Sequence, residues 1–547
     1  MNIKQYYTMV RNIFNGITLR HTIGSLCVAA LVLLSGCGDF LEEYSQDKYR
    51  VSSYTDLDEL LIGDGYLQVK PSKYATNSQN IGHFIHFLAD EIEEQNKGRT
   101  TASSGVENRQ IKNALFGYFT WQKRVGQNEN FTGFNTENKT WKETYRLINV
   151  ANNILETVDG VPQRTNEEKQ GAARVKGEAA FLRAAYYFWL TNLYGKAYNP
   201  STAATDLAVP LKTEAKVNDI LYSRNSVQEL YDCILADLTV AEQCLKDVPS
   251  TGSIYRADIH AVWLLASRVH LYMQHWDEAA RYAGLLIEAR PELVDMNGQV
   301  MKLTKESPEV IFSMGGHEIP CNMDYKYQSF RVDKSLYDAY STDDLRRTQW
   351  WWTYDNFVGY IKVPEGTKYS SSSYPPSNNR HYTYVYNNGL LDVLAPVSDK
   401  FLYRTAEAYL NKAEAEACRG QEAAAKEALY ALRSHRYKLG TDYTTAATGD
   451  ELIQEIREER RKELALEGHR WFDLRRYAVS QVAPYSKELV HRYTYYTAYN
   501  KATMVETRVF TLPAGDPAYT LPIPQEVLEF NIGMPNNERP DRSYTVE

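Results

Sequence analysis

EERRKELALEGHRWFDLRRY, residues 458–477, is the stretch that decides the fold. Of the 19 residues from Glu458 to Arg476, 11 are Asp, Glu, Lys or Arg, and five apolar residues lie among them: Leu464, Leu466, Trp471, Phe472 and Leu474. A solvated helix does not need these apolar residues. A helix that packs one face into a core and pairs its flanks with neighbouring carboxylates and guanidiniums needs both kinds. Gly468 predicts a break before a second short helical turn, and Glu458 and Lys462 are expected to pair.

Two motifs in the C-terminal part resemble a known family. The run ERRKELALEGHRWFDLRR resembles the C-terminal signature of the SusD/RagB-like proteins, which are nutrient-binding surface lipoproteins of Bacteroidetes. YTLPIPQEVLEFNIGMPNNERP, residues 519–540, resembles the closing motif of that family. The resemblance extends from Cys37 to the C-terminus and is weakest at 95–110 and 341–389. It implies a mostly α fold of about four tetratricopeptide-like helix pairs with a loop-rich ligand-binding insertion.

The N-terminus resembles a lipoprotein leader. Residues 1–21 are basic, 22–34 are mostly apolar, and Leu34-Ser35-Gly36-Cys37 has the form of a lipobox. The apolar run is too short for a comfortable membrane span, which needs about 20 residues. We expect a signal peptide at 1–36, lipidation by acyl chains such as palmitate at Cys37, and an acidic tether over 37–53 that resembles a surface-export signal.

Composition limits the partners. Beyond the leader, the chain has 58 basic and 69 acidic residues, so nucleic acid is an unsuitable partner. The 42 Tyr and 9 Trp suit cores, but they also suit sugar and peptide surfaces. Beyond Cys37 the cysteines are Cys233, Cys244, Cys321 and Cys418. Cys233 and Cys244 fall on one expected helix, too far apart to bridge each other, and we expect buried free thiols.

Apolar residues recur at helical spacing on both sides of an irregular region, residues 308–400. We expect helices at 54–61, 83–91, 141–155, 178–195, 226–246, 257–273, 275–289, 401–420 and 421–436, loops at 62–80 and 95–110, and a single domain over 54–547. Its parts would be an N-terminal half at 54–300, an insertion at 301–400 and a C-terminal half at 401–547. Periodicity alone supports only paired antiparallel helices, and the resemblance supplies the repeat assignment.

The insertion combines turn residues with aromatic rings. A strand is expected at 309–316, a short helix at 333–340 and an aromatic hairpin at 485–512. The family's ligand sites are made from loops, which here are 66–110 and 317–386. Trp350, Trp351 and Trp352 are the sharpest ligand candidates because three successive side chains of an extended segment cannot all be buried on one side. Weaker candidates are Tyr74, Asn77 and Asn96.

The chain contains no anchored catalytic motif, such as GxSxG, a P-loop, HExxH or GxGxxG. Glu407, Glu414 and Glu416 are better explained by helix pairing than by catalysis. His83 and His86 lack a third-ligand pattern, so we expect neither a metal nor a cofactor.

The resemblance implies a function without catalysis. An outer-membrane lipoprotein on the cell surface would bind an oligosaccharide and deliver it to a SusC-type TonB-dependent transporter. The alternatives are peptide capture, as in the RagB branch, a glycoside hydrolase or esterase, and a scaffold without a small ligand.

Overall fold

The computed structural model describes residues 51–67, 81–95, 106–216, 218–298, 301, 303–316, 330–354, 357–363, 365–367, 382–387, 390–392, 397–496 and 504–547. The chain divides into two units after Ser52, and the unit Ser53–Glu547 contains the elements that follow. The expected signal peptide, Cys37 and the tether up to residue 50 lie outside the described residues.

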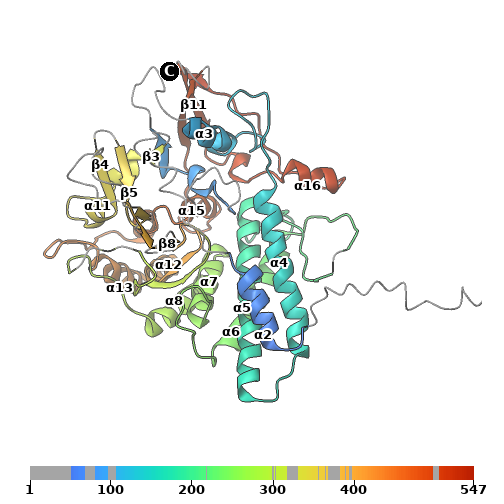
Figure 1. The fold of residues 1–547 in the computed structure, drawn as a ribbon. Helices are drawn as coiled ribbons and strands as arrows, with labels where there is room; N and C mark the ends of the chain where they lie inside the picture. Colours follow the sequence, from blue (N-terminus) through green and yellow to red (C-terminus); the bar gives the residue numbers. More distant parts are fainter. Residues whose placement is uncertain are drawn as a thin grey trace, which may run out of the picture. The chain divides into compact units, whose positions relative to one another are not determined.

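Four N-terminal helices lie side by side as one layer, α2 (Tyr54–Leu60), α4 (Lys139–Thr157), α5 (Asn166–Tyr194) and α6 (Val227–Leu245) (Figure 1). Helix α3 (Val106–Phe119) lies apart from this layer (Figure 1). Ser53, Thr165 and Ser226 begin α2, α5 and α6 with capping boxes, in which side chain and backbone satisfy each other's free N–H groups. The second half of α5 is buried on all sides between α4 and α6.

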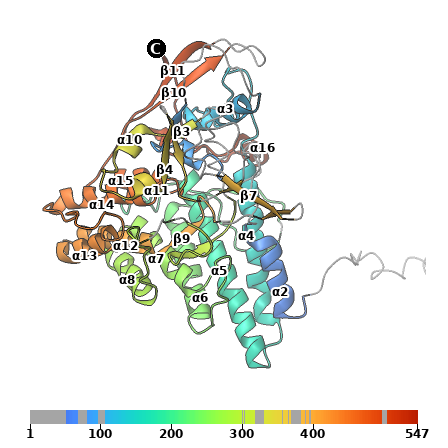
Figure 2. The same cartoon turned by 60° about the vertical axis from the view of Figure 1, so that its left-hand side comes forward.

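Two helical hairpins continue this layer, although about 115 residues separate them in the sequence (Figure 2). The first is α7 (Ile259–Tyr272) with α8 (Trp276–Ala289), and the second is α12 (Thr405–Cys418) with α13 (Glu422–Arg433). Helix α8 packs against α12, and both carry fully buried alanines, including Ala279, Ala283, Ala406 and Ala413. The mostly helical fold is therefore confirmed, and the assignment of its pairs to tetratricopeptide-like units stays a prediction.

The stretch at 458–477 divides between two helices, α14 (Gly449–Glu463) and α15 (Arg470–Ala478). Leu466 at φ 57° and Gly468 at φ 79° make the turn between them, which confirms the predicted break. The expected Glu458–Lys462 pair is wrong. Glu458 pairs instead with Arg461 at 3.1 Å, and Lys462 with Glu459 at 3.0 Å, because Lys462 lies on the buried side of α14.

Short strands connect the distant segments. The strands are β1 (Ile92–Glu94), β2 (Val310–Ser313), β3 (Phe330–Val332), β4 (Trp351–Tyr354), β5 (Phe357–Tyr360), β6 (Glu365–Thr367), β7 (Tyr382–Asn387), β8 (Leu390–Asp392), β9 (Leu402–Arg404), β10 (Leu489–Tyr496), β11 (Met504–Leu512) and β12 (Thr545–Val546). The pairs β1–β3, β2–β9, β4–β5, β7–β8, β10–β11 and β11–β12 are antiparallel, and β6–β7 is parallel. Three short helices complete the chain, α10 (Lys334–Asp338), α11 (Arg346–Gln349) and α16 (Gln525–Phe530).

Several further sequence predictions are confirmed and others are wrong. The loop expected from residue 62 begins later, because a π-helix, Leu61–Gly65, continues α2. The strand at 309–316, the short helix at 333–340 and the hairpin at 485–512 are present. The helix expected at 83–91 is only a 3-10 turn, Ile85–Phe87, because the following residues pair as β1 with β3, more than 230 residues away. Residues 106–110 belong to α3 and not to a loop. Cys233, Cys244 and Cys418 are free thiols but half-buried, not buried.

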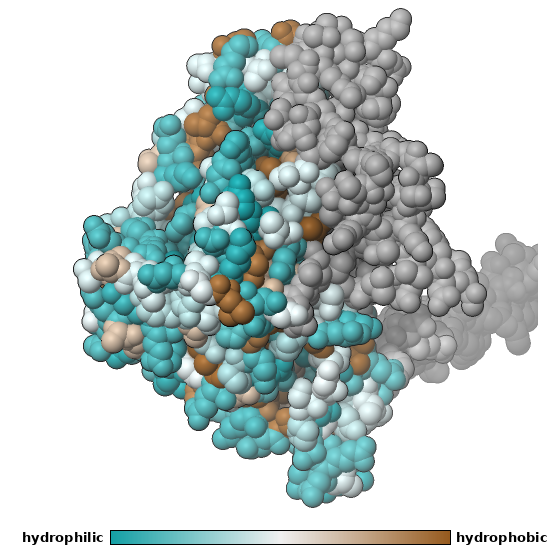
Figure 3. All heavy atoms as spheres, turned by 90° about the vertical axis from the view of Figure 1, so that its left-hand side faces the viewer, coloured by the Kyte–Doolittle hydropathy of each residue, from teal (hydrophilic) through white to brown (hydrophobic). Residues whose placement is uncertain are grey.

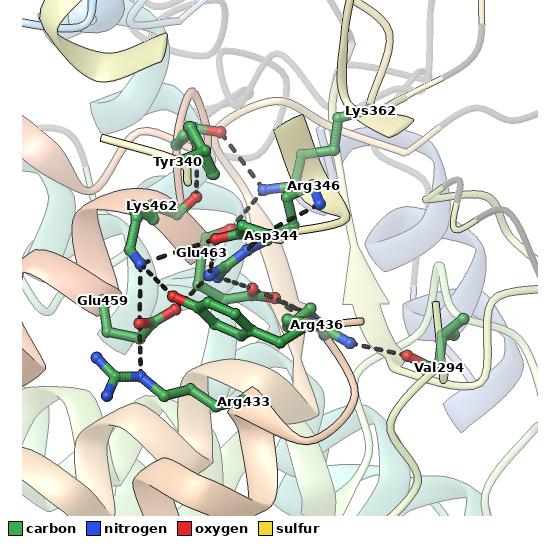
Figure 4. A network of polar contacts seen from close by, with 12 residues as sticks. Val294, Tyr340, Asp344, Arg346, Lys362, Arg433, Arg436, Glu459, Lys462 and Glu463 are labelled. Carbon is green, nitrogen blue, oxygen red and sulfur yellow. Dashed lines mark hydrogen bonds and ion pairs between the residues drawn. The ribbon is translucent and has the colours of Figure 1, made fainter. Parts of the chain in front are cut away.

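A buried group of ion pairs surrounds Glu463 at the end of α14 (Figure 4). Its carboxylate accepts hydrogen bonds from Arg346 at 2.8 Å, Arg404 at 2.7 Å and Arg436 at 3.0 Å, and all four side chains are fully buried. Burial alone raises the pKa of Glu463, but the three guanidiniums outweigh burial and hold the pKa well below its usual value. This carboxylate therefore joins α14 to α11, to the end of β9 and to the segment after α13.

The same kind of pairing continues along α14 and α15. The further pairs are Asp344–Arg346, Arg346–Glu459, Arg433–Glu459, Glu309–Arg436, Arg404–Glu467, Lys362–Glu467, Arg460–Asp473, Arg457–Glu414, Arg476–Glu414 and Arg268–Glu407. The predicted guanidinium–carboxylate ties are confirmed, and the charged residues themselves are buried. In this interior, removing one partner leaves an uncompensated charge.

We expect Arg346→Ala to lower the free energy of unfolding by about 3–5 kcal/mol, because Glu463, Glu459 and Asp344 would lose a shared buried partner. Urea denaturation measures the change. Arg281→Ala is the matched control, since its pair with Glu278 is exposed and is worth under about 1 kcal/mol. Equal losses in the two variants would contradict the role of the network.

Candidate functional site

The three adjacent tryptophans lie at the start of the β4–β5 hairpin. Trp350 ends α11 and is fully buried, with the Nζ of Lys362 at 4.1 Å from its ring centroid. Trp351 is 2% exposed and lies between Tyr340 and Tyr360, with ring centroids 5.7 and 5.8 Å away. Because α11 turns into β4 at this point, two of the three rings are buried among different neighbours, and only Trp352 is half-buried.

The position of the Trp352 ring depends on a glycine. Trp352 pairs with Gly359 across the hairpin, and a Cβ placed at Gly359 would lie 2.0 Å from the indole Nε1 of Trp352. The indole therefore lies over the bare backbone of Gly359, and the ring of Phe357 supports it at a centroid distance of 4.9 Å. This packing fixes a large, partly exposed ring on a rigid hairpin.

The hairpin is attached to α14 at both of its ends. Arg346, four residues before Trp350, joins the ion pairs of Glu459 and Glu463. Lys362, two residues after β5, is fully buried and donates a hydrogen bond to the Glu463 backbone oxygen at 2.6 Å. The signature stretch therefore determines where the tryptophans lie.

The other predicted ligand residues, Tyr74, Asn77 and Asn96, lie outside the described residues, as do large parts of 66–110 and 317–386. Their binding role stays a prediction, as does that of the tryptophans. The described strands nevertheless show how the two segments meet. Strand β1, which ends two residues before Asn96, pairs with β3, which leads into α10 and the tryptophan hairpin.

Two acidic residues attach β1 to the signature stretch. Asp90 accepts hydrogen bonds from Arg470 at 2.7 and 3.0 Å. Glu91 accepts the N–H of Leu466 at 2.9 Å, at the residue with a left-handed backbone. Burial raises the pKa of Glu91 to about 7, and the charge of Asp90 adds to the increase.

The surface around the hairpin is mainly polar. On the face that carries α11, α13 and the β4–β5 hairpin, hydrophilic residues cover most of the described surface and hydrophobic residues form separate small areas (Figure 3). A site on this face would therefore combine single exposed rings with polar groups, which is the composition that sugar hydroxyls and C–H edges require.

A separate cavity of about 730 Å³ was not indicated by the sequence. It lies between the segment after α5, the end of α15 and the C-terminal segment, and Lys196, Asn199, Arg224, Arg475, Tyr519 and Asn537 are among its lining residues. None of the lining residues belongs to the insertion at 301–400. The arginines that line the cavity are visible in the sequence, but only the tertiary structure brings them together.

The acidic residues considered for catalysis form ion pairs with arginines. Glu407 pairs with Arg268, Glu414 with Arg457 and Arg476, and Glu416 with Arg419, as the helix-pairing interpretation predicts. Among the described residues, no group of three His, Cys, Asp or Glu side chains could hold a metal ion. Within the same part of the chain, none of the helices has the length and apolar character needed to cross a bilayer.

Comparison with known proteins identifies the family. The model of the SusD family matches residues 316–539, and a model described as "Starch-binding associating with outer membrane" matches residues 65–271. The SusD-like protein P38 of Formosa agariphila is 26% identical over 383 residues, which are 62% of this chain and 72% of P38. The chain belongs to the SusD/RagB-like family.

Solved structures of SusD-like proteins have the same fold. A SusD-like carbohydrate binding protein from Bacteroides vulgatus is 19% identical and covers 88% of this chain and 98% of its own, with a TM-score of 0.63. Surface glycan-binding protein A from Bacteroides fluxus, at 19% identity, covers 89% and 99%, with a TM-score of 0.60. The fold is therefore shared along most of the chain.

We expect Glu91→Gln to change how stability depends on pH. The pKa of Glu91 is raised in the folded protein, so its contribution to stability is fully present below about pH 4.5 and is lost as the pH rises through about 7. The free energy of unfolding of the natural protein should therefore fall relative to that of the variant by about 3 kcal/mol over this range. Urea denaturation at a series of pH values measures the difference, and a constant difference would contradict the prediction.

Proposed function

We propose that this protein is a cell-surface lipoprotein that binds oligosaccharide nutrients and delivers them to a SusC-type TonB-dependent transporter. Membership of the SusD/RagB-like family carries the proposal, and the match to the starch-binding, outer-membrane-associated model favours a carbohydrate over a peptide. The fold shared with a surface glycan-binding protein also supports it. The protein would bind its ligand without transforming it.

The exposed part of the Trp352 ring is the feature of the described structure that suits a sugar. Gly359 and Phe357 hold the indole in place, so little conformational entropy is lost when a ligand contacts it. A flat aromatic face contacts the C–H edges of a sugar, and polar groups of the loops would bind the hydroxyls. In this proposal the buried rings of Trp350 and Trp351 pack under the hairpin and support it. Tyr74, Asn77 and Asn96 would contact the ligand from the loops.

A lipid bound covalently to Cys37 would attach the protein to the membrane. Acyl chains on this thiol would hold the mature protein at the outer membrane, with the acidic tether leading to the helical domain. A stable complex with a transporter requires a large interface, and the helical layer offers an extended packed surface for it.

We expect Trp352→Ala to weaken oligosaccharide binding about tenfold, or about 1.4 kcal/mol, because the ring's contact with the sugar is lost. The ligand is first found on a glycan array, and affinity is then measured by calorimetry. Trp263→Ala is the matched control, since Trp263 is a half-buried tryptophan on α7, outside the insertion. Gly359→Ala should also weaken binding, because the new Cβ would displace the indole while leaving it present.

The same calorimetry, extended to a pool of peptides, separates the proposal from peptide capture. Binding of peptides together with failure on every glycan would overturn the choice of ligand. Release of reducing sugar from a polysaccharide by the purified protein would establish a hydrolase instead. Unchanged glycan affinity in Trp352→Ala would remove this ring from the site.

We expect Cys37→Ser to abolish lipidation, because serine lacks the thiol that receives the diacylglycerol. Cells grown with labelled palmitate should incorporate the label into the natural protein and not into the variant. The variant should also leave the membrane fraction, while Cys233→Ser, which changes a free cysteine on α6, should behave as the natural protein does. Label on the Cys37→Ser variant would contradict the assignment.

A further inference from the structure

Three buried arginines differ from the others in having no carboxylate partner. Among the described residues 14 arginines are buried, and 11 of them form an ion pair with an acidic side chain. For the remaining three, Arg224, Arg475 and Arg539, the described part of the chain provides no carboxylate oxygen within 4.0 Å. In a protein that pairs its buried charges so consistently, this exception requires an explanation.

Two of the three exceptions, Arg224 and Arg475, line one cavity of about 730 Å³, and Arg539 is not among its lining residues. Arg539 donates a hydrogen bond at 2.9 Å to the backbone oxygen of Thr520, which is another lining residue. Burial lowers the pKa of Arg224 and Arg475 to about 10 and that of Arg539 to about 9, so all three remain charged at neutral pH.

Backbone carbonyls at the end of α5 compensate only part of this charge. Arg475 donates to the backbone oxygens of Asn192 and Gly195, and Arg224 donates to that of Tyr194 at 3.2 Å. Arg224 also donates to neutral acceptors outside α5, the backbone oxygens of Leu207, Ala208 and Pro535 and Oδ1 of Asn537. The C-terminus of a helix carries about half a negative charge. Three guanidiniums carry three positive charges, so a surplus remains.

Some donors of these groups also remain available. Nε of Arg539 has no hydrogen-bond partner, and none of the described residues accepts from Nε of Arg475. A guanidinium presents its N–H groups as a planar fork that matches two oxygens of one anion. The charge and the free donors therefore indicate the same kind of ligand.

The other charged residues of the lining are mostly neutralised locally. Lys196 pairs with Asp206 at 2.7 Å, Lys487 with Asp90, and Asp516 with Arg542 at 2.9 Å. Glu538 is exposed. The side-chain amides of Asn199 and Asn536 can donate to the remainder of a polar ligand. The hydroxyls of Thr202, Thr205 and Tyr519 already donate to Asp206 and to the backbone oxygens of Thr202 and Lys487, so they can only accept from a ligand.

We propose that this cavity is a second binding site, for the oxyanion group, carboxylate or sulfate, of a small polar molecule such as an acidic sugar. The site is independent of Trp352, since no lining residue belongs to the insertion. Its volume lies within the range of about 300–1,000 Å³ that is usual for small-molecule sites. An anion here would remove the cost of holding unneutralised guanidiniums in a low-dielectric interior.

Calorimetry on the purified protein at constant ionic strength tests the proposal with four probes: digalacturonate, glucose 6-sulfate, inorganic sulfate and glucose. We expect at least one oxyanion to bind at least tenfold more tightly than glucose. Binding of the acidic sugars assigns the ligand to them, while binding of inorganic sulfate alone supports the site and assigns it to a free anion. Failure of all three oxyanions to exceed glucose would overturn the proposal.

Three variants locate the binding. Arg224→Gln and Arg475→Gln should each weaken the oxyanion at least tenfold, because each removes a positive charge at the cavity. Ala478→Trp should block the cavity without affecting the fold, since Ala478 lines it at an exposed position. Arg281→Gln is the control, as its exposed guanidinium pairs with Glu278 at 2.8 Å.

The result is decisive even if an arginine variant does not fold, because Ala478→Trp then carries the test. Oxyanion affinity that survives in Ala478→Trp, or that falls equally in Arg281→Gln, would show that the three arginines only hold the end of α5 and the C-terminal segment. Either result leaves the proposal for Trp352 unaffected, since that ligand is measured with neutral oligosaccharides.

Discussion

The carboxylate of Glu463 is the point on which the structure depends. It is fully buried and holds Arg346, Arg404 and Arg436, which come from three segments separated by up to 90 residues. Each of these cations would be costly to bury alone, and each is satisfied only when all the segments are in place. The ion pairs therefore favour one arrangement of the helical layer, the strands and the insertion over looser alternatives.

This arrangement also connects fold with function. The chain on both sides of the tryptophan hairpin is tied to α14, by Arg346 before it and by Lys362 after it. On the other side of the signature stretch, Asp90 and Glu91 attach the strand that leads toward Asn96. Helices α14 and α15 and the turn between them thereby hold β1 and the tryptophan hairpin, the described parts of the two segments proposed to bind a ligand, and such binding requires no catalytic group.

The buried arginines at the cavity near the end of α5 lack the carboxylate partners that the other buried arginines of the described chain have. Around Glu463 every buried guanidinium faces a carboxylate, whereas Arg224 and Arg475 donate to backbone carbonyls and line the cavity. Helix-end carbonyls explain why the arginines can be buried here. They leave the charges of Arg224 and Arg475 without a carboxylate partner, which a bound oxyanion would supply.

The sequence by itself determined the helices, the family and the pairing chemistry, because helical periodicity and the charged, apolar-studded run at 458–477 are local patterns. It did not determine that residues after Phe87 would pair as β1 with β3, that Trp350 and Trp351 would be buried, or that Arg224 and Arg475 would meet at one cavity. The strand pair and the cavity depend on contacts between segments hundreds of residues apart, and the burial of the tryptophans depends on how their hairpin packs. Only the tertiary structure decides such contacts, since burial and partner choice are properties of the packed chain and not of its local sequence.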